Sequence, residues 1–160
     1  METASTVNPS ALRQAMGRFP TGVTVVTTET KAGPLGCTIS AFCSVSLDPP
    51  LVLVSVGRER GMHGPLTQGR GFVVNVLGED QADVAMTFAK PVADRFSRVE
   101  TTCGRYGPRI TDAIAVMECE LHDALPCGDH TLAIGRVRDL DVRSGNPLVY
   151  ADGAFLEVSA

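Results

Sequence analysis

The sequence has 160 residues, of which 44% are hydrophobic and 20% charged, and its net charge is −4. A chain of this length can bury a sizeable core without disulfides or metals, so we expect a single domain over residues 1–160. The slightly acidic balance, with no basic stripe, excludes the charge pattern of a nucleic-acid-binding protein. No segment approaches the roughly 18 uninterrupted apolar residues of a membrane span, so we expect no membrane partner.

The first predicted element is a helix that begins at Asn8. The sequence Asn8-Pro9-Ser10 joins an N-cap side chain to a proline in the first helical turn, and Gly17 ends the segment. Residues 1–8 are expected to form a flexible terminus. The N-terminus lacks the basic patch and apolar run of a signal peptide, and the five cysteines include no CxxC pair. We therefore expect a cytoplasmic protein with reduced thiols.

Most of the remaining chain predicts β-strands. Runs of β-branched or alternating apolar residues lie at 21–30, 37–46, 51–57, 72–77, 113–123, 130–142, 147–150 and 154–158. A turn at 31–36 makes the run at 37–46 the hairpin partner of the run at 21–30. The run at 51–57, "LVLVSVG", is expected to be buried on both faces of a sheet.

Loops and a second helix separate these strands. Residues 58–71 predict a long loop that includes a helical turn, residues 79–89 a helix, and residues 90–112 irregular structure. At Gly135 the alternation of the strand over 130–142 changes register, which predicts a β-bulge. Because strands do not alternate with helices, we expect an antiparallel sheet, and this number of strands favours closure into a barrel. The predicted fold class is mainly β, an antiparallel barrel with two or three peripheral helices.

The strand over 113–123 bears on a possible metal site. A string of metal-binding residue types resembles a zinc motif: Cys119, His122, Cys127 and His130. Residues three apart on a strand point to opposite faces, so Cys119 and His122 cannot chelate together. The alternation instead places Glu118, Glu120 and His122 on the exposed face, and no metal site is expected.

Small hydroxyl side chains are concentrated in residues 38–46. If this segment is one strand, Thr38, Ser40, Phe42 and Ser44 share a face. Hydroxyls beside an aromatic ring make a poor core and a suitable wall for a polar, planar ligand. A solvent-exposed serine-rich edge explains the pattern equally well, so both interpretations stay open.

His130 is a second candidate site residue. It follows Asp129 in a glycine turn, "CGDH", that leads into a strand, and loops of this kind display functional residues. The alternative is a turn histidine bonded to a backbone carbonyl. The sequence contains no GxGxxG fingerprint and no P-loop, so a bound nucleotide would not use either cradle.

The chain resembles the flavin reductase family with an FMN-binding split barrel, the small reductase components of two-component flavin-dependent monooxygenases. The resemblance runs from about residue 15 to 155 in the order of the family. Its matching segments are "GVTVVTT", "TISAFCSVSLDPPLVLVSV", "FVVNVL", "QADVAMTFA" with "DRF", "MECEL" and "GDHTLAIGRV". The resemblance implies a split β-barrel, a homodimer, and flavin bound near the subunit interface.

The resemblance also implies roles for individual residues. His130 matches the histidine at the nicotinamide side and is the implied catalytic residue. Positions that match the family's flavin-binding segments are Thr38, Ile39, Ser40, Ala41, Phe42, Ser55, Val56, Gly57, Arg58, Asn75, Phe88, Arg95, Phe96, Gly128 and Asp129. The sequence departs from the family at Arg58-Glu59-Arg60, where phosphate-binding hydroxyls are usual. Arg58 or Arg60 could bind a phosphate instead, whereas Glu59 would oppose an anion.

The implied activity is NAD(P)H-dependent flavin reduction. A hydride passes from nicotinamide C4 to flavin N5, and reduced FMN or FAD is handed to a separate oxygenase. The hydride donor is NADH or NADPH. Alternatives on the same fold are an oxidase or monooxygenase that retains its flavin, and a carrier or sensor that binds flavin or heme without catalysis.

Overall fold

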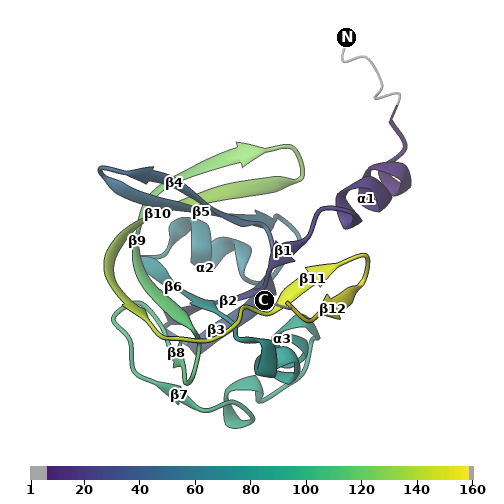
Figure 1. Ribbon diagram of the computed structural model, residues 1–160. Coiled ribbons are helices and arrows are strands. Elements are labelled where there is room, and N and C mark those ends of the chain that lie inside the picture. The colour runs from purple at the N-terminus through teal and green to yellow at the C-terminus, as the bar shows by residue number, and fades with distance from the viewer. Residues whose placement is uncertain (1–6, 159–160) are drawn as a thin grey trace.

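The structure is a computed structural model that describes residues 7–158. Most of the terminus expected to be flexible, residues 1–6, therefore lies outside the described residues. Helix α1 (Pro9–Gly17) confirms the first predicted element, and the Asn8 side chain accepts a hydrogen bond from the Ser10 N–H at 2.8 Å. No residue of α1 is buried, and the helix stands away from the sheet (Figure 1).

A seven-stranded antiparallel sheet dominates the described fold, in the order β3-β2-β6-β9-β10-β5-β4. The strands are β2 (Thr24–Thr30), β3 (Gly33–Ile39), β4 (Phe42–Leu47), β5 (Pro50–Gly57), β6 (Gly71–Val76), β9 (Ala115–Cys127) and β10 (His130–Val142). The sheet curves so strongly that β3, at one edge, approaches β5 near the other edge (Figure 1). The prediction of a mainly β, antiparallel fold is confirmed.

Short strands complete the β-structure. A three-stranded sheet contains β1 (Thr21–Gly22), β11 (Val149–Ala151) and β12 (Ala154–Leu156), and the two-stranded sheet pairs β7 (Thr101–Thr102) with β8 (Arg109–Ile110). The strands predicted near the C-terminus are thus confirmed.

The prediction of one strand over residues 37–46 is wrong. The turn after β2 is shorter than expected, and β3 already begins at Gly33, whose φ of 113° suits glycine. Strand β3 pairs with β2 as predicted but ends at Ile39. The chain then crosses to the other edge of the sheet, where β4 pairs with β5. Residues 38–46 therefore do not form a single alternating face, because a strand break and a change of partner separate Ile39 from Phe42.

Strand β5 is buried on one face only. The prediction that the run at 51–57 is buried on both faces is therefore wrong. Val52, Val54 and Val56 are buried, and the alternating residues Leu51 and Leu53 are half-buried. The strand lies next to the edge strand β4, and its inward residues Val52, Val54 and Val56 pack in the core with Leu66 of the helix inside the curve of the sheet.

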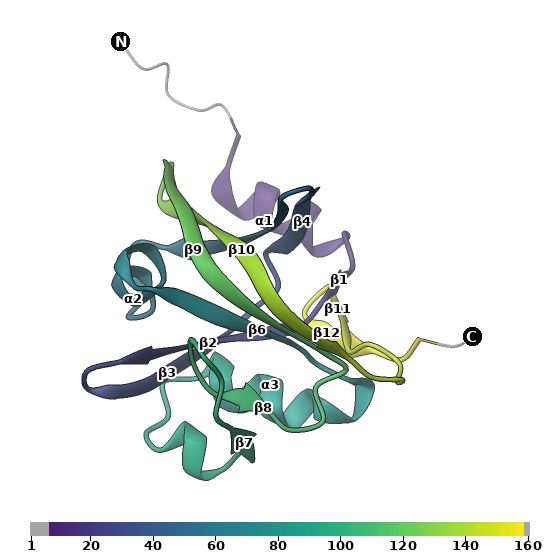
Figure 2. The ribbon, with the colours of Figure 1, turned by 90° about the vertical axis from the view of Figure 1, so that its left-hand side faces the viewer.

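The α-helices of the described residues occupy different sides of the sheet. Helix α2 (His63–Gln68) lies inside its curve and packs against β2, β9 and β10 (Figure 1). Helix α3 (Ala82–Ala89) follows the 3₁₀ turn η1 (Glu79–Gln81) and covers β2 and β3 from the other side. Figure 2 shows α3 beneath the projecting β2–β3 hairpin. Both the helical turn predicted within 58–71 and the helix predicted over 79–89 are confirmed.

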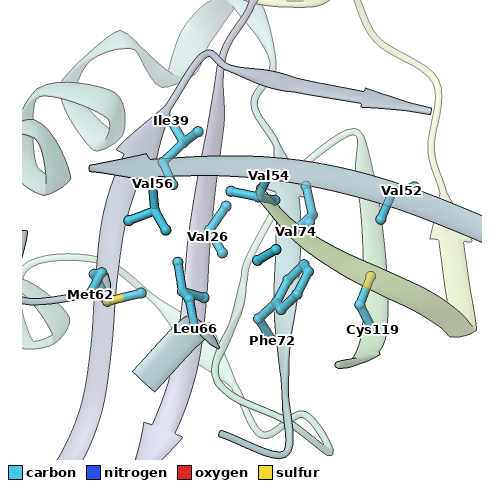
Figure 3. Packing of buried hydrophobic residues seen from close by; sticks show 11 residues of the cluster. Val26, Ile39, Val52, Val54, Val56, Met62, Leu66, Phe72, Val74 and Cys119 are labelled. Carbon is cyan, nitrogen blue, oxygen red and sulfur yellow. The ribbon is translucent and has the colours of Figure 1, made fainter. Parts of the chain in front are cut away.

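The main hydrophobic core lies between the curved sheet and α2 (Figure 3). Its members are Val26, Ile39, Val52, Val54, Val56, Met62, Leu66, Phe72, Val74, Cys119 and Ala133. The bulge predicted at Gly135 is confirmed by a register shift between β9 and β10. A Cβ at Gly135 would lie 2.6 Å from Cζ of Phe72, so this close approach requires glycine.

Among the described residues, no helix combines the length and the apolar character needed to cross a membrane.

Candidate functional site

Three segments that are distant in sequence meet where the two edges of the sheet approach each other. The Ser55 N–H donates a hydrogen bond to the carbonyl of Ala41 at 3.0 Å, which joins the end of β5 to the link between β3 and β4. His130 pairs with Gly57 across β10 and β5, and the Arg58 N–H donates to the carbonyl of Asp129 at 3.1 Å. The link, the end of β5 and the tip of the β9–β10 hairpin thus form one continuous surface.

The side chains along this surface differ in what they offer a ligand. Ile39 and Val56 point into the core, so only their backbones are available (Figure 3). Ser40 and Ala41 are exposed, and Phe42 is half-buried against the same core.

Two of the implied flavin-binding residues have polar groups that are used inside the fold. The Thr38 hydroxyl donates to the carbonyl of Ala85 at 2.5 Å and so holds α3 against β3. Asn75 is fully buried; its Nδ2 donates to the carbonyl of Val25 at 3.0 Å, and its Oδ1 accepts from the Ile110 N–H at 2.8 Å. The structure thus places the Asn75 amide in the interior, away from the surface formed by the three segments.

Phe88, Phe96 and Arg95 lie together over β3. The two rings make an edge-to-face contact with centroids 5.1 Å apart. The Arg95 Nη1 donates to the carbonyl of Gly36 at 2.7 Å, and Nε donates to the carbonyl of Val92 at 3.1 Å. A Cβ at Gly36 would lie 2.9 Å from Cε1 of Phe88, so glycine is what lets these rings approach the strand.

The charges of Arg60 and Arg95, which come from different segments, both act on the thiol of Cys37. Burial raises the pKa of the Cys37 thiol to about 11, and the charges of Arg95 and then Arg60 oppose that rise. Within residues 7–158 neither arginine forms an ion pair, whereas Arg138 and Arg143 do. Two arginines without a carboxylate partner, one from each segment, offer the kind of donors that a phosphate group requires.

His130 is held by its neighbour. Its Nδ1 lies 2.7 Å from Oδ1 of Asp129, and that hydrogen bond, followed by the charge of His130, holds the pKa of Asp129 below its ordinary value. An ionised carboxylate only accepts hydrogen bonds, so Nδ1 carries the proton and Nε2 faces the end of β5. A Cβ at Gly57 would lie 3.6 Å from that Nε2. Gly128, with a φ of 60°, forms the turn that brings the pair to the surface.

Comparison with known proteins decides the family. The family model described as "Flavin reductase like domain" matches residues 16–159. The chain belongs to this family.

Relatives within the flavin reductase family match almost the whole chain. A probable flavin reductase of Rhizobium meliloti (strain 1021) is 46% identical over 155 residues, which cover 96% of this chain and 50% of the relative. The chain thus spans half the length of that relative. The reductase component of a 4-nitrophenol 4-monooxygenase/4-nitrocatechol 2-monooxygenase of Rhodococcus opacus is 39% identical, over 93% of this chain and 80% of the relative.

A solved family member matches the fold along its whole length. The NADH:FAD oxidoreductase SgcE6 of Streptomyces globisporus C-1027, in complex with NAD and FAD fragments, superimposes with a TM-score of 0.91. It is 38% identical, and the match covers 98% of both chains.

The structure adds residues to this region that the sequence pattern did not single out. Gly36 and Cys37 on β3, and His63 and Thr131 below the end of β5, carry contacts described by the structure. A glycine inside a predicted strand indicates a close approach, which is the signal that could have identified Gly36. The charge of Arg60, with that of Arg95, acts on the Cys37 thiol, whereas the Arg58 N–H donates to the carbonyl of Asp129.

The zinc-like string shows a different arrangement. Cys119 is buried in the core, and His122 is exposed on β9. Within residues 7–158, no cluster of three or more histidine, cysteine or acidic side chains could hold a metal ion.

Proposed function

We propose that this protein is an NAD(P)H-dependent flavin reductase that supplies reduced FMN or FAD to a separate monooxygenase. The observation that carries the proposal is the meeting of the open link at Ser40 and Ala41, the end of β5 and His130 on one surface. Arg60 and Arg95, which form no ion pair among the described residues, add positive charge. Family relatives support it, because they include an NADH-dependent FMN reductase, an NADH-dependent FAD reductase and reductase components of monooxygenases. NADH is therefore the favoured donor.

The residues of the site fit a planar ligand that carries a phosphate. Ser40 and the backbone of the 39–42 link offer hydrogen-bonding groups to the polar edge of the ring system, with Phe42 beside it. Arg60 and Arg95 would bind the phosphate through charge-assisted hydrogen bonds, with Arg58 at the outer side of the same turn. The bound nicotinamide and flavin together supply the chemistry, a hydride transfer from C4 to N5.

His130 acts in this proposal by orienting the nicotinamide. Its Nε2 would hydrogen-bond the carboxamide while Asp129 fixes the other side of the ring. Alignment of two reacting rings accounts for a large share of the rate of such a transfer. His130 moves no proton, and its exposed position at the hairpin tip leaves the site open for release of the reduced flavin.

The proposed fold is the split barrel of the family, formed as one domain, and the proposed assembly is a homodimer. Apolar side chains on the outer surface support a second copy: Leu47 is 94% exposed, and Val45 and Leu125 are exposed to about half. Monomers rarely expose large contiguous apolar patches, and a partner subunit would cover these side chains.

One cuvette experiment tests the function. NADH consumption is measured with no flavin and with added FMN, FAD or riboflavin. Consumption that depends on added flavin is expected. A yellow protein that does not consume NADH would support the carrier, and turnover that requires an organic substrate would support the flavin-retaining oxygenase.

His130→Ala tests the assigned role. Turnover is expected to fall by about tenfold or more, with flavin affinity mostly unchanged, because only the nicotinamide loses its alignment. His122→Ala, which changes an exposed histidine on the same hairpin, serves as the control and should behave like the wild type. Unchanged NADH oxidation in His130→Ala would remove His130 from the mechanism.

A further inference from the structure

His63 makes a contact that the proposed reaction does not explain. Its Nε2 lies 2.9 Å from the hydroxyl of Thr131, in a partly buried environment. Thr131 is 5% exposed, follows His130 in β10, and pairs with Val56 of β5. The bond therefore joins the first residue of α2 to the strand that carries His130.

Residues 57–62, from the end of β5 to α2, are held to β10 by this bond and by the bond from the Arg58 N–H to the carbonyl of Asp129. The segment contains glycine at 57 and 61 and three exposed charged residues, Arg58, Glu59 and Arg60, so its unconstrained conformational entropy is high. Backbone bonds form two tight turns: the Arg60 N–H donates to the carbonyl of Gly57 at 3.0 Å, and the His63 N–H donates to the carbonyl of Arg60 at 2.9 Å.

Within the described residues, the bond to Thr131 is the one hydrogen bond made by a side chain of residues 57–64. Met62, 5% exposed, adds an apolar anchor in the core. Met62 fixes the depth of the segment, whereas the directional bond of His63 fixes its rotation. Arg60 lies three residues before His63, whose N–H donates to the Arg60 carbonyl, so the constraint at His63 extends to the backbone of Arg60.

We propose that His63 is a positioning residue that holds Arg60 for the flavin phosphate through its hydrogen bond to Thr131. This inference rests on the proposed function, because it assumes that a flavin phosphate binds at Arg60 and Arg95. It makes His63 a determinant of specificity for phosphorylated flavins over riboflavin, although His63 itself touches no ligand.

A positioning role and a merely structural role of His63 predict different flavin affinities. Loss of one net hydrogen bond corresponds to about a 3- to 10-fold change in an equilibrium constant. If His63 acts through Arg60, that loss appears in FMN affinity and is absent from riboflavin affinity, because riboflavin carries no phosphate. A merely structural role would weaken both ligands alike.

The experiment is a double-mutant cycle of His63→Ala and Arg60→Ala on the full chain. Dissociation constants of FMN and riboflavin are measured by quenching of flavin fluorescence, with thermal melting of each protein. His63→Ala is expected to weaken FMN about 3- to 10-fold, to leave riboflavin within twofold, and to have no further effect in the Arg60→Ala background. His63→Gln, which keeps a donor toward Thr131, should restore much of the FMN affinity.

Two further variants keep the test decisive. Thr131→Val removes the same bond from the other side and should reproduce the FMN-selective loss if His63→Ala does not fold. Thr67→Ala, which removes the 2.7 Å bond from Thr67 to the His63 carbonyl within α2, is the matched control and should leave the FMN-to-riboflavin ratio unchanged. If His63→Ala weakened FMN and riboflavin equally, or if the effects of His63→Ala and Arg60→Ala on FMN affinity were additive, this inference would be wrong. The proposed function would still stand. A wild-type protein that binds neither flavin would overturn the proposed function and this inference with it.

Discussion

Replacement of Glu118 tests how the loop over the sheet is held in place. The Glu118 side chain is 3% exposed, and its Oε2 accepts hydrogen bonds from the N–H groups of Arg105 at 2.8 Å and Tyr106 at 3.2 Å. Its Oε1 lies 4.0 Å from Nη1 of Arg109. One buried carboxylate thus anchors residues 104–109 to β9.

The expected cost follows from these contacts. Hydrogen bonds to a charged acceptor contribute about 1.5–3 kcal/mol each, and Glu118→Gln keeps one acceptor oxygen but loses the charge. We therefore expect Glu118→Gln to lower the free energy of unfolding by about 1–3 kcal/mol. Glu118→Ala leaves two N–H groups and Arg109 without their partner, and should cost about 3–5 kcal/mol.

Glu120 provides the matched control on the same strand. It pairs with Arg138 at the surface, where ion pairs contribute little. Urea unfolding followed by circular dichroism measures both variants. With a slope of about 2 kcal/mol/M, a 2 kcal/mol loss moves the midpoint by about 1 M. Glu120→Gln should leave the midpoint within error, and equal midpoints for the two variants would refute the assigned anchoring role.

Two further predictions concern β3 and the buried thiols. Gly36→Ala should lower the free energy of unfolding by about 1–3 kcal/mol and weaken FMN binding, because the new methyl group displaces Phe88. Gly22→Ala is the control, since a Cβ there would have nothing within 4 Å. Thermal melting and flavin titration measure both variants. Burial raises the pKa of Cys37 to about 11 and of Cys119 to about 12, above unfolded values near 8.5. Their contribution to stability is complete below the unfolded pKa and is lost as pH rises toward 11. The free energy of unfolding should therefore fall between about pH 9 and 10.5, and it should fall less steeply in Cys37→Ala than in the wild type. Identical pH slopes for the two proteins would contradict the raised pKa of Cys37.

The sequence predicted most of the strands because local chemistry decides them, whereas the run at 37–46 divides between two strands. The β-branched run at 21–30 and the helix capped by Asn8 appear as expected, since neither depends on distant contacts for its type. Glu118 shows where this fails. Alternation correctly separates Glu118 from Cys119, but the exposed face of a strand becomes buried when a distant irregular loop covers it. No periodic pattern in residues 90–112 predicts that this segment covers the strand.

The site itself lies where periodicity ends. Residues 40 and 41 join opposite edges of the curved sheet, and Gly57 and Gly128 lie at strand ends, so no alternation rule assigns a direction to their neighbours. An edge strand leaves backbone N–H and C=O groups unpaired, which is a liability on an open sheet. In this structure the two edges curve toward each other, and the link over residues 40 and 41 carries the chain from one edge to the other. Because β3 ends at Ile39 and β4 begins at Phe42 on the other edge, the hydroxyls of Thr38 and Ser40 do not share the single alternating face that the sequence pattern predicted.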